Sequence, residues 1–407
     1  MNSKDKVSLI AFVVLVGFLF SIVYHYILGS FFKLGYPYNS FLFFPNNVFG
    51  DFAASLMQIK LPIPYEGGWT CVYLPFFYMF GRIFLVLRFE VVLVIFLLTT
   101  SLIIFYLNLY NIKNGAVKLW DIQQSLILTF MSFPFLFCWD RCNFEILVLV
   151  IVYFSLYLYR KKSYYLSALF LSFAVAMKPF SIFLIILFIK DKRFREAFLL
   201  IISIAIITFL SLLSMQGKVV YSFRLLINNL SYTQNVLPFD LSTLGFCDFG
   251  NSIFGALKFI YLITKSNFVL SMMRGYNVLV TILFVAISFS LFAFVKEFWK
   301  KTFLIFAMTC LFPYISADYR LIYFIIPLHF FIKSFSDNKK MDYLFCILFA
   351  LLFIPKNYIC YLTKTGYNGV IFDPLIIFTF VVLIIWQDFN EYWRVNNLKV
   401  QSNLVNK

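Results

Sequence analysis

The sequence has 407 residues, of which 62% are apolar, 22% aromatic and only 13% charged, and its mean hydropathy is +0.89. A soluble domain carries about 25% charged residues, so this composition excludes a water-soluble globule, and it also excludes intrinsic disorder. The apolar runs are continuous and near 20 residues long, whereas the strands of a membrane barrel alternate over about ten residues. The composition therefore predicts an all-α polytopic membrane protein.

Apolar runs with basic flanks predict about twelve transmembrane helices in a single integral membrane domain over residues 1–407. The predicted spans are 7–28, 89–110, 119–139, 143–160, 163–177, 180–190, 195–213, 276–295, 301–315, 319–333, 342–355 and 371–386. Two long segments, 29–88 and 216–275, separate some of these spans. Because both are rich in Phe, Tyr and Leu, we expect short amphipathic helices on the membrane surface, one of them over 72–87 with Arg82 and Arg88 at the headgroups.

The chain is strongly basic, with 34 Lys and Arg against 18 Asp and Glu and a net charge of +16. In a soluble protein this excess would suggest a nucleic-acid partner, but in a membrane protein it marks the cytoplasmic loops. With the N-terminus inside, the short basic loops and the tail at 387–407 all fall on the inner side. We therefore predict an inner (plasma) membrane protein with both termini cytoplasmic, both long segments outside and no nucleic-acid partner.

Seven cysteines are present, an odd number. Cys71, Cys247 and Cys360 fall in predicted outer loops, where a Cys71–Cys247 disulfide would be permitted. No CxxC motif or Cys/His cluster suggests a metal site.

An ionisable residue within or beside a membrane span is costly, so each one is a functional-site hypothesis. The first is Asp51, in the sequence Gly50-Asp51-Phe52, which opens a predicted helix over 51–59. Asp51 is either an N-cap that accepts hydrogen bonds from the first helical turn or a carboxylate base facing the membrane–water boundary.

The second position is the turn Asp140-Arg141-Cys142-Asn143, which joins two predicted spans on the outer side. Glu145 lies four residues after Arg141, so the two side chains would share a helix face and could pair. The turn is therefore either a hairpin closed by an ion pair or an anion clamp made by Arg141 and Asn143.

The remaining positions also lie toward the outer face. Lys178 precedes Pro179, which breaks the helix, so the lysine forms a hairpin tip where it either snorkels to the surface or binds a phosphate. The turn 318–320 (DYR) joins two further spans, and His329 lies about three helical turns deeper. A lone histidine in a span is either a packing residue or a ligand.

These positions have a common chemistry. Asp51, Arg141, Lys178 and Arg320 are all predicted at the same membrane face, beside the two long outer segments. One carboxylate with several cations suits a phosphate-bearing substrate in the outer leaflet.

The order of these motifs resembles the GT-C glycosyltransferases, and specifically glycosyltransferase family 87. The resemblance rests on GDF at 50–52, VYLPFFY at 72–78, DRCN at 140–143, AVAMKP at 174–179 and DYRL at 318–321, with Asn251-Ser252 similar to a further family stretch. The chain departs from the family pattern at Leu74-Pro75, where members usually have two prolines, and at Cys142, where they usually have glycine.

The resemblance implies a GT-C-like enzyme that moves one sugar, such as a mannose-like hexose, from a polyprenyl-phosphate donor to the hydroxyl of a glycolipid or glycan acceptor, with inversion. Asp51 would be the general base. Arg141, Lys178, Arg320 and His329 would bind the donor phosphate, and Asn143, Asp140, Tyr319 and Tyr73 would contact the substrate.

The sequence has no Gly-rich phosphate loop after a strand and no cytosolic domain for a nucleotide sugar, so we expect a lipid-linked donor. No carboxylate cluster demands a metal, and we predict neither metal nor cofactor. Two alternatives remain: an O-antigen-type polymerase or ligase using diphosphate-linked oligosaccharides, and a lipid or sugar transporter (flippase). The position of Asp51 before the DRCN and MKP turns favours the monosaccharide enzyme, and the absence of an internal repeat disfavours transport.

Overall fold

The computed structural model describes residues 1–43, 45–68, 70–113, 115–216, 219–242, 244–247, 249–335, 338–358 and 369–405. The regular structure of these residues is helical, with one isolated β-bridge between Gly250 and Ala317. The α-helices are α1 (Ser3–Ser30), α2 (Gly50–Lys60), α3 (Pro75–Gly81), α4 (Phe89–Ile112), α5 (Leu119–Phe130), α6 (Phe133–Arg141), α7 (Glu145–Arg160), α8 (Tyr164–Met177), α9 (Ile185–Lys190), α10 (Phe194–Leu213), α11 (Val219–Asn235), α12 (Ile253–Thr264), α13 (Asn267–Arg274), α14 (Tyr276–Ala293), α15 (Phe298–Leu311), α16 (Ile325–Ile332), α17 (Lys339–Phe353) and α18 (Gly369–Val405).

Short 3₁₀ helices extend or join these elements, at Pro45–Asn47, Pro64–Gly67, Arg82–Leu85, Pro179–Leu184, Leu237–Phe239, Gly245–Cys247 and Asp318–Phe324. Helical structure lies at each of the twelve predicted spans, which confirms the all-helical class.

Five helices in the described residues, α1, α4, α10, α14 and α18, are long and apolar enough to cross a membrane. The pair α5 and α6, which bends by 55° between Phe130 and Phe133, makes a sixth candidate. The protein is therefore a multi-pass membrane protein. The other helices at predicted spans are shorter, so the total of twelve crossings stays a prediction.

The long helix α4 illustrates how the sequence forms these spans. Its 24 residues extend over about 36 Å at 1.5 Å per residue, enough to cross the hydrocarbon core. Leu98 and Leu102 are exposed on one face, while Phe96 and Ile104 are buried on the other. Apolar side chains on both faces are expected of a helix that packs on its neighbours on one side and meets lipid on the other.

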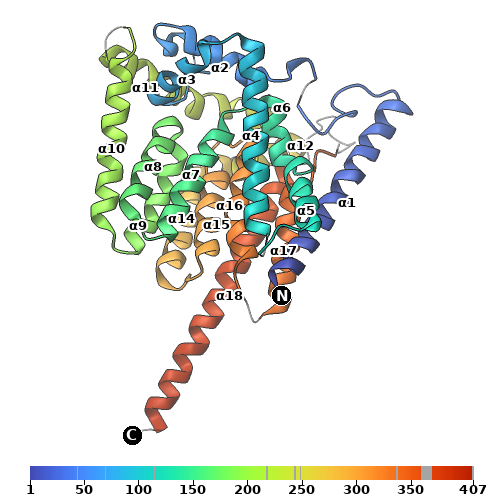
Figure 1. Cartoon of the computed structure of the whole chain (residues 1–407), viewed down its shortest axis with the longest axis vertical. Helices are drawn as coiled ribbons and strands as arrows, with labels where there is room; N and C mark the ends of the chain where they lie inside the picture. The colour runs from blue at the N-terminus through green and yellow to red at the C-terminus, as the bar shows by residue number, and fades with distance from the viewer. Residues whose placement is uncertain are drawn as a thin grey trace.

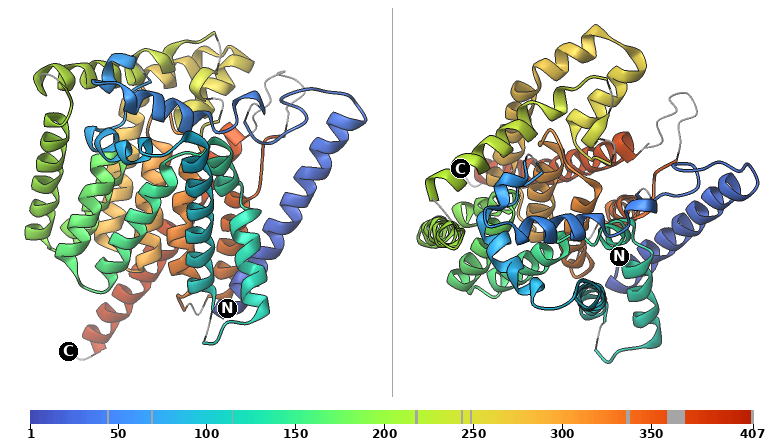
Figure 2. Two further views of the ribbon diagram at one scale, coloured as in Figure 1. Left: turned by 45° about the horizontal axis from the view of Figure 1, so that its top comes forward. Right: turned by 90° about the horizontal axis from the view of Figure 1, so that it is seen from above.

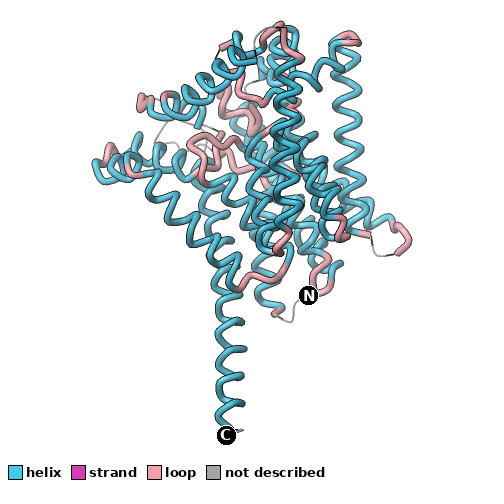
Figure 3. Tube along the Cα trace, turned by 90° about the vertical axis from the view of Figure 1, so that its left-hand side faces the viewer, coloured by secondary structure: helices cyan, strands magenta, loops and turns pink. Residues whose placement is uncertain are grey.

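The long helices run side by side, and both termini lie at the same end of the bundle (Figure 1). The helices α2, α3 and α11 lie across the opposite end, which Figure 2 shows from two further directions. The helix α18 extends beyond the bundle on the side of the termini (Figure 3). The segment between α1 and α4 and the segment between α10 and α14 therefore fold into helices, as expected, and contribute to a cap over one end.

Several local expectations need correction. The helix predicted over 51–59 is Gly50–Lys60, and the helix predicted over 72–87 consists of α3 followed by the 3₁₀ helix Arg82–Leu85. The guanidinium of Arg82 donates to the carbonyl of Ser214 at 3.0 Å, so it fastens the cap to the end of α10. Cys71 has a free, buried thiol, so the Cys71–Cys247 disulfide is wrong. Cys360 lies outside the described residues.

Candidate active site

The helix α2 begins directly over the end of α6. Its N-cap Phe49 has a left-handed backbone (φ 58°), and the N–H of Phe49 donates to the carbonyl of Asp140 at 2.7 Å. A Cβ atom on Gly50 would clash with the Asn47 side chain and stand 3.0 Å from Nη2 of Arg141. Glycine at position 50 therefore lets α2 approach this arginine closely.

The carboxylate of Asp51 does not cap α2, because Phe49 is the N-cap and no side chain caps this helix. The N-cap alternative for Asp51 is therefore wrong. Oδ1 of Asp51 instead accepts from Nη2 of Arg141 at 2.6 Å and from Nε at 3.2 Å, while Oδ2 accepts from the Asn143 amide at 2.7 Å. Asp51 thus joins α2 to the α6–α7 turn, which follows about ninety residues later in the chain.

The α6–α7 turn owes its shape to Cys142, which has φ 48° and ψ 47°. The N–H of Cys142 donates to the carbonyl of Trp139, and that of Asn143 to the carbonyl of Cys138, both at 2.9 Å. A residue in the left-handed region ends a helix in this manner, and glycine adopts that conformation most readily. The glycine that family members usually have here is thus explained by the backbone. Because Cys142 ends α6, Arg141 and Glu145 belong to different helices, and the predicted pair between them does not form.

Lys178 follows the last residue of α8 and has an extended backbone (φ −139°, ψ 120°), and Pro179 opens the next 3₁₀ helix. The predicted helix break at this proline is confirmed. The ammonium of Lys178 forms an ion pair with Glu145 and lies 3.4 Å from Oδ1 of Asn143.

Two aromatic rings flank this ammonium. It lies 4.7 Å from the centre of the Tyr73 ring and 5.2 Å from that of Tyr319, so it has favourable cation–π contacts on two sides. Burial, together with the charges of Asp51 and Glu145, raises the pKa of Tyr73 well above its ordinary value. This phenol therefore stays protonated at neutral pH.

Asn143 connects the two ion pairs. Its amide N–H donates to Asp51, and its carbonyl oxygen accepts from the backbone of Glu145 at 2.9 Å and from Lys178. The side chain of Asp51 is 28% exposed, that of Lys178 is 11% exposed, and that of Glu145 is fully buried. The cluster is therefore accessible from outside at Asp51, whereas Glu145 buries its far side behind Lys178.

The structure brings six of the nine predicted site residues into this cluster: Asp51, Arg141, Asn143, Lys178, Tyr73 and Tyr319. Asp140 adjoins it and is mostly buried, with its backbone carbonyl bonded to Phe49.

Arg320 and His329 contact other residues and do not join the two ion pairs of the cluster. The guanidinium of Arg320 donates to the carbonyl of Thr309 at 3.3 Å and lies 5.3 Å from the centre of the Phe180 ring, although its charge still acts on Tyr73. His329 is fully buried in α16, with Nε2 2.8 Å from Oδ1 of Asn108.

Sequence reasoning assigned Glu145 to the wrong partner and left it out of the site. Lys178 itself was a signal for this role, because a lysine that is buried at a hairpin tip needs an acidic partner.

The role of Asn251 also went unassigned. Its backbone N–H donates to the carbonyl of Ser316 at 2.8 Å and its amide to that of Ala317 at 3.3 Å. Asn251 therefore fastens the second long segment to the residues that directly precede Tyr319.

The fold and the cluster define a multi-pass membrane protein with a charged, partly open site at the end of the bundle opposite the termini. Residues 69–312, more than half of the chain, match the model of glycosyltransferase family 87. The chain belongs to this family, and it is a membrane glycosyltransferase. The match includes Arg141, Asn143 and Lys178, while Asp51 and Tyr319 lie outside it. No curated protein and no solved structure matches the chain significantly.

Proposed function

We propose that this protein transfers one sugar from a polyprenyl-phosphate donor to an acceptor hydroxyl, with inversion and with Asp51 as the general base. The observation that carries the proposal is the link through Asn143 between the partly exposed carboxylate of Asp51 and the buried ammonium of Lys178. A displacement at a sugar–phosphate bond requires a base and a phosphate-binding cation that are held close to each other.

The carboxylate of Asp51 has room for a further hydrogen bond. A carboxylate offers about four lone-pair positions, and three hydrogen bonds from Arg141 and Asn143 occupy part of them. The acceptor hydroxyl would donate to a remaining position. In the transfer, the acceptor oxygen forms a bond to the anomeric carbon as the bond from that carbon to the phosphate oxygen breaks. The hydroxyl proton passes to Asp51, and the lipid phosphate leaves with the electron pair.

The leaving phosphate needs positive charge, and Lys178 is suited to supply it. An ammonium has three N–H donors, of which two are directed to Glu145 and Asn143. The third would bind a phosphate oxygen. The guanidinium of Arg141 donates to Asp51 and, through Nη1, to the backbone carbonyl of Asn47, and it has further N–H groups for the phosphate. Buried and fixed in place, these cations would stabilise the developing charge, so the proposed step uses no metal ion.

The position of the cluster supports a lipid-linked donor. The cluster lies at one end of the bundle of membrane-spanning helices. The rings of Tyr73 and Tyr319 would border the sugar. The positive-inside distribution of the short loops supports an outer-leaflet position for this end. A mannose-like hexose as the sugar and a glycolipid or glycan as the acceptor complete the proposal.

The proposal can be tested with purified protein, a panel of radiolabelled polyprenyl-phosphate sugars and extracted lipid acceptors. Arg141→Ala and Lys178→Ala should raise the donor concentration needed for half-maximal transfer by about tenfold or more, the usual effect of losing a charge-assisted bond. Lys60→Ala, at the exposed end of α2, is the matched control and should leave it unchanged. An unchanged donor dependence in both site variants would refute the phosphate assignment. Transfer from diphosphate-linked oligosaccharides alone would favour the polymerase or ligase alternative instead.

A further inference from the structure

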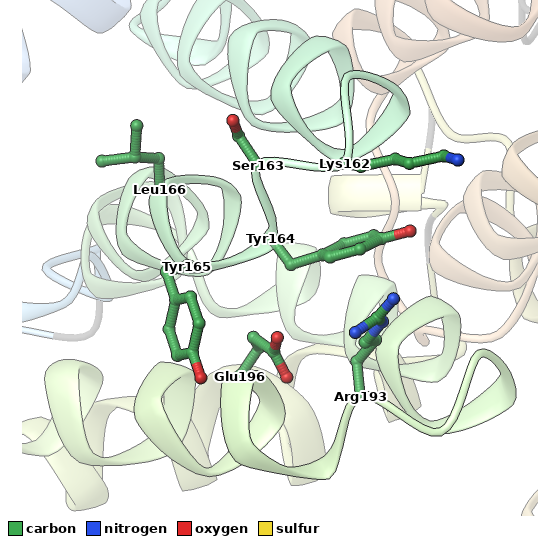
Figure 4. A pocket seen from close by; sticks show the side chains of 7 residues that line it. All are labelled: Lys162, Ser163, Tyr164, Tyr165, Leu166, Arg193 and Glu196. Atoms are coloured by element: carbon green, nitrogen blue, oxygen red, sulfur yellow. The ribbon is translucent and has the colours of Figure 1, made fainter.

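A second polar site lies at the other end of the bundle, where α8 and α10 begin, on the side of the two termini. It is a pocket of about 440 Å³ lined by residues of the α7–α8 and α9–α10 turns and of the helices that follow them (Figure 4). The lining residues are Lys162, Ser163, Tyr164, Tyr165, Leu166, Arg193 and Glu196.

Glu196 is the unusual member of this pocket. It is only 6% exposed, and in the described part of the chain its carboxylate has neither a hydrogen bond nor an ion pair. Its position in the first turn of α10 gives it a favourable interaction with the helix dipole. Its two oxygens are not among the fully buried, unpartnered atoms of the described residues, so they are reached from the pocket that Glu196 lines. Figure 4 shows the carboxylate facing the pocket, where a cationic N–H donor would satisfy it.

The same pocket also has the features of an anion site. The guanidinium of Arg193 lies 4.2 Å from the centre of the Tyr164 ring and forms no ion pair with Glu196 or with another described acid. Lys162 adds a second positive charge to the lining. The N-cap of α8, Ser163, makes no side-chain capping bond, so the first amides of this 14-residue helix remain available to a phosphate.

Apolar surface borders the pocket. Leu166 is 50% exposed at the start of α8, and Phe194 and Phe198 are 61% and 64% exposed at the start of α10. Because α10 is long and apolar enough to cross a membrane, its exposed Phe194 and Phe198 are expected to meet acyl chains. The pocket therefore adjoins lipid, which favours a lipid headgroup over a free metabolite.

We propose that this pocket binds the headgroup of an aminophospholipid of the phosphatidylethanolamine type, in the leaflet on the side of the termini. Its phosphate would contact Arg193, Lys162 and the first turn of α8, and its primary ammonium would donate to Glu196. An anionic headgroup without an amine would leave Glu196 unpaired. Basic pockets between membrane helices on the cytoplasmic side are a common place for lipid headgroups, and the acid in this one selects for an amine.

The test is lipid binding to the delipidated full-length protein, measured by native mass spectrometry during titration with phosphatidylethanolamine, phosphatidylcholine or phosphatidylglycerol. Phosphatidylethanolamine should bind about tenfold more tightly than phosphatidylcholine, whose methylated ammonium has no N–H for Glu196. Glu196→Gln should abolish this preference, and Arg193→Gln should weaken both lipids. Glu90→Gln is the matched control, since Glu90 is an exposed acid in the first turn of α4, and it should keep the preference.

Three results would overturn the proposal. Equal binding of phosphatidylethanolamine and phosphatidylcholine to the wild type would remove the role of Glu196. A preference for phosphatidylglycerol would mean that the pocket selects anionic headgroups. Displacement of the lipid by free phosphoethanolamine at the same concentration as the lipid would identify a soluble ligand instead.

Discussion

Glu145→Gln removes the negative charge on which the buried ammonium of Lys178 depends. Glu145 is fully buried and Lys178 nearly so, and removing one partner of such a pair costs about 3–5 kcal/mol. Because the Tyr73 and Tyr319 rings and Asn143 still face the ammonium, we expect a cost near the lower end, about 3 kcal/mol. The midpoint of thermal unfolding of the protein in nanodiscs should fall clearly.

A second substitution separates stability from chemistry. In the double variant Glu145→Gln/Lys178→Met both charges are gone, and a buried pair replaced by neutral groups of similar size is often close to neutral in stability. The double variant should therefore recover most of the lost unfolding midpoint. It should still lack sugar transfer, because no ammonium remains to bind the leaving phosphate.

The assay is thermal unfolding of the wild type, both single variants and the double variant, with transfer measured on the same samples. If the double variant is no more stable than Glu145→Gln, the two side chains do not act as a pair. Normal transfer by the double variant would show that Lys178 has no part in the reaction.

Three further predictions follow from the backbone and the buried network. Gly50→Ala should lower transfer, measured with saturating acceptor, by about tenfold or more, because the added Cβ would displace the Asn47 side chain and press on the Arg141 guanidinium. The variant should still unfold cooperatively, and wild-type transfer would contradict this prediction. Cys142→Gly should fold normally, whereas Cys142→Val should lower the free energy of unfolding by about 1–3 kcal/mol, since a β-branched residue is strained at positive φ; equal stability of the two would contradict this. His329→Leu should destabilise the protein by about 1–3 kcal/mol, because Oδ1 of Asn108 and the amide of Asn111 each lose their contact with the imidazole. The donor dependence of the remaining activity should be unchanged, and a weakened donor dependence would return His329 to the phosphate site.

The sequence was sufficient to predict the helices and the turns that bear the site. Each predicted span was a run of apolar residues with charged or Pro/Gly boundaries, and such runs are local signals. Lys178 before Pro179 and the DRCN turn were found because a helix must end there and a charge is costly there. The end of α6 at Cys142 could not be predicted in detail, because cysteine seldom adopts the left-handed conformation that ends this helix.

The partners within the site could not be predicted from local patterns. Asp51 meets Arg141 only because α2 folds back over the α6–α7 turn, and Glu145 meets Lys178 only because α7 and α8 lie side by side. For the same reason His329 could be placed about three helical turns below the outer turn by counting residues, but its partners Asn108 and Asn111 belong to α4, more than two hundred residues away. Such contacts depend on how the helices pack.

The general-base role of Asp51 is tested most directly by the rate of sugar transfer by Asp51→Asn. Asparagine is isosteric and retains an oxygen for Arg141, but it loses the charge of the ion pair and its amide NH2 cannot accept from Asn143. The protein should therefore insert, unfold cooperatively at a midpoint somewhat below that of the wild type, and bind the donor no more weakly. Transfer should fall by at least about 100-fold, the effect of losing a general base, while Glu66→Gln, a change at another acid of the same segment, should leave it unchanged. Transfer by Asp51→Asn at the wild-type rate would show that Asp51 is only a structural partner of Arg141 and would contradict the proposed mechanism.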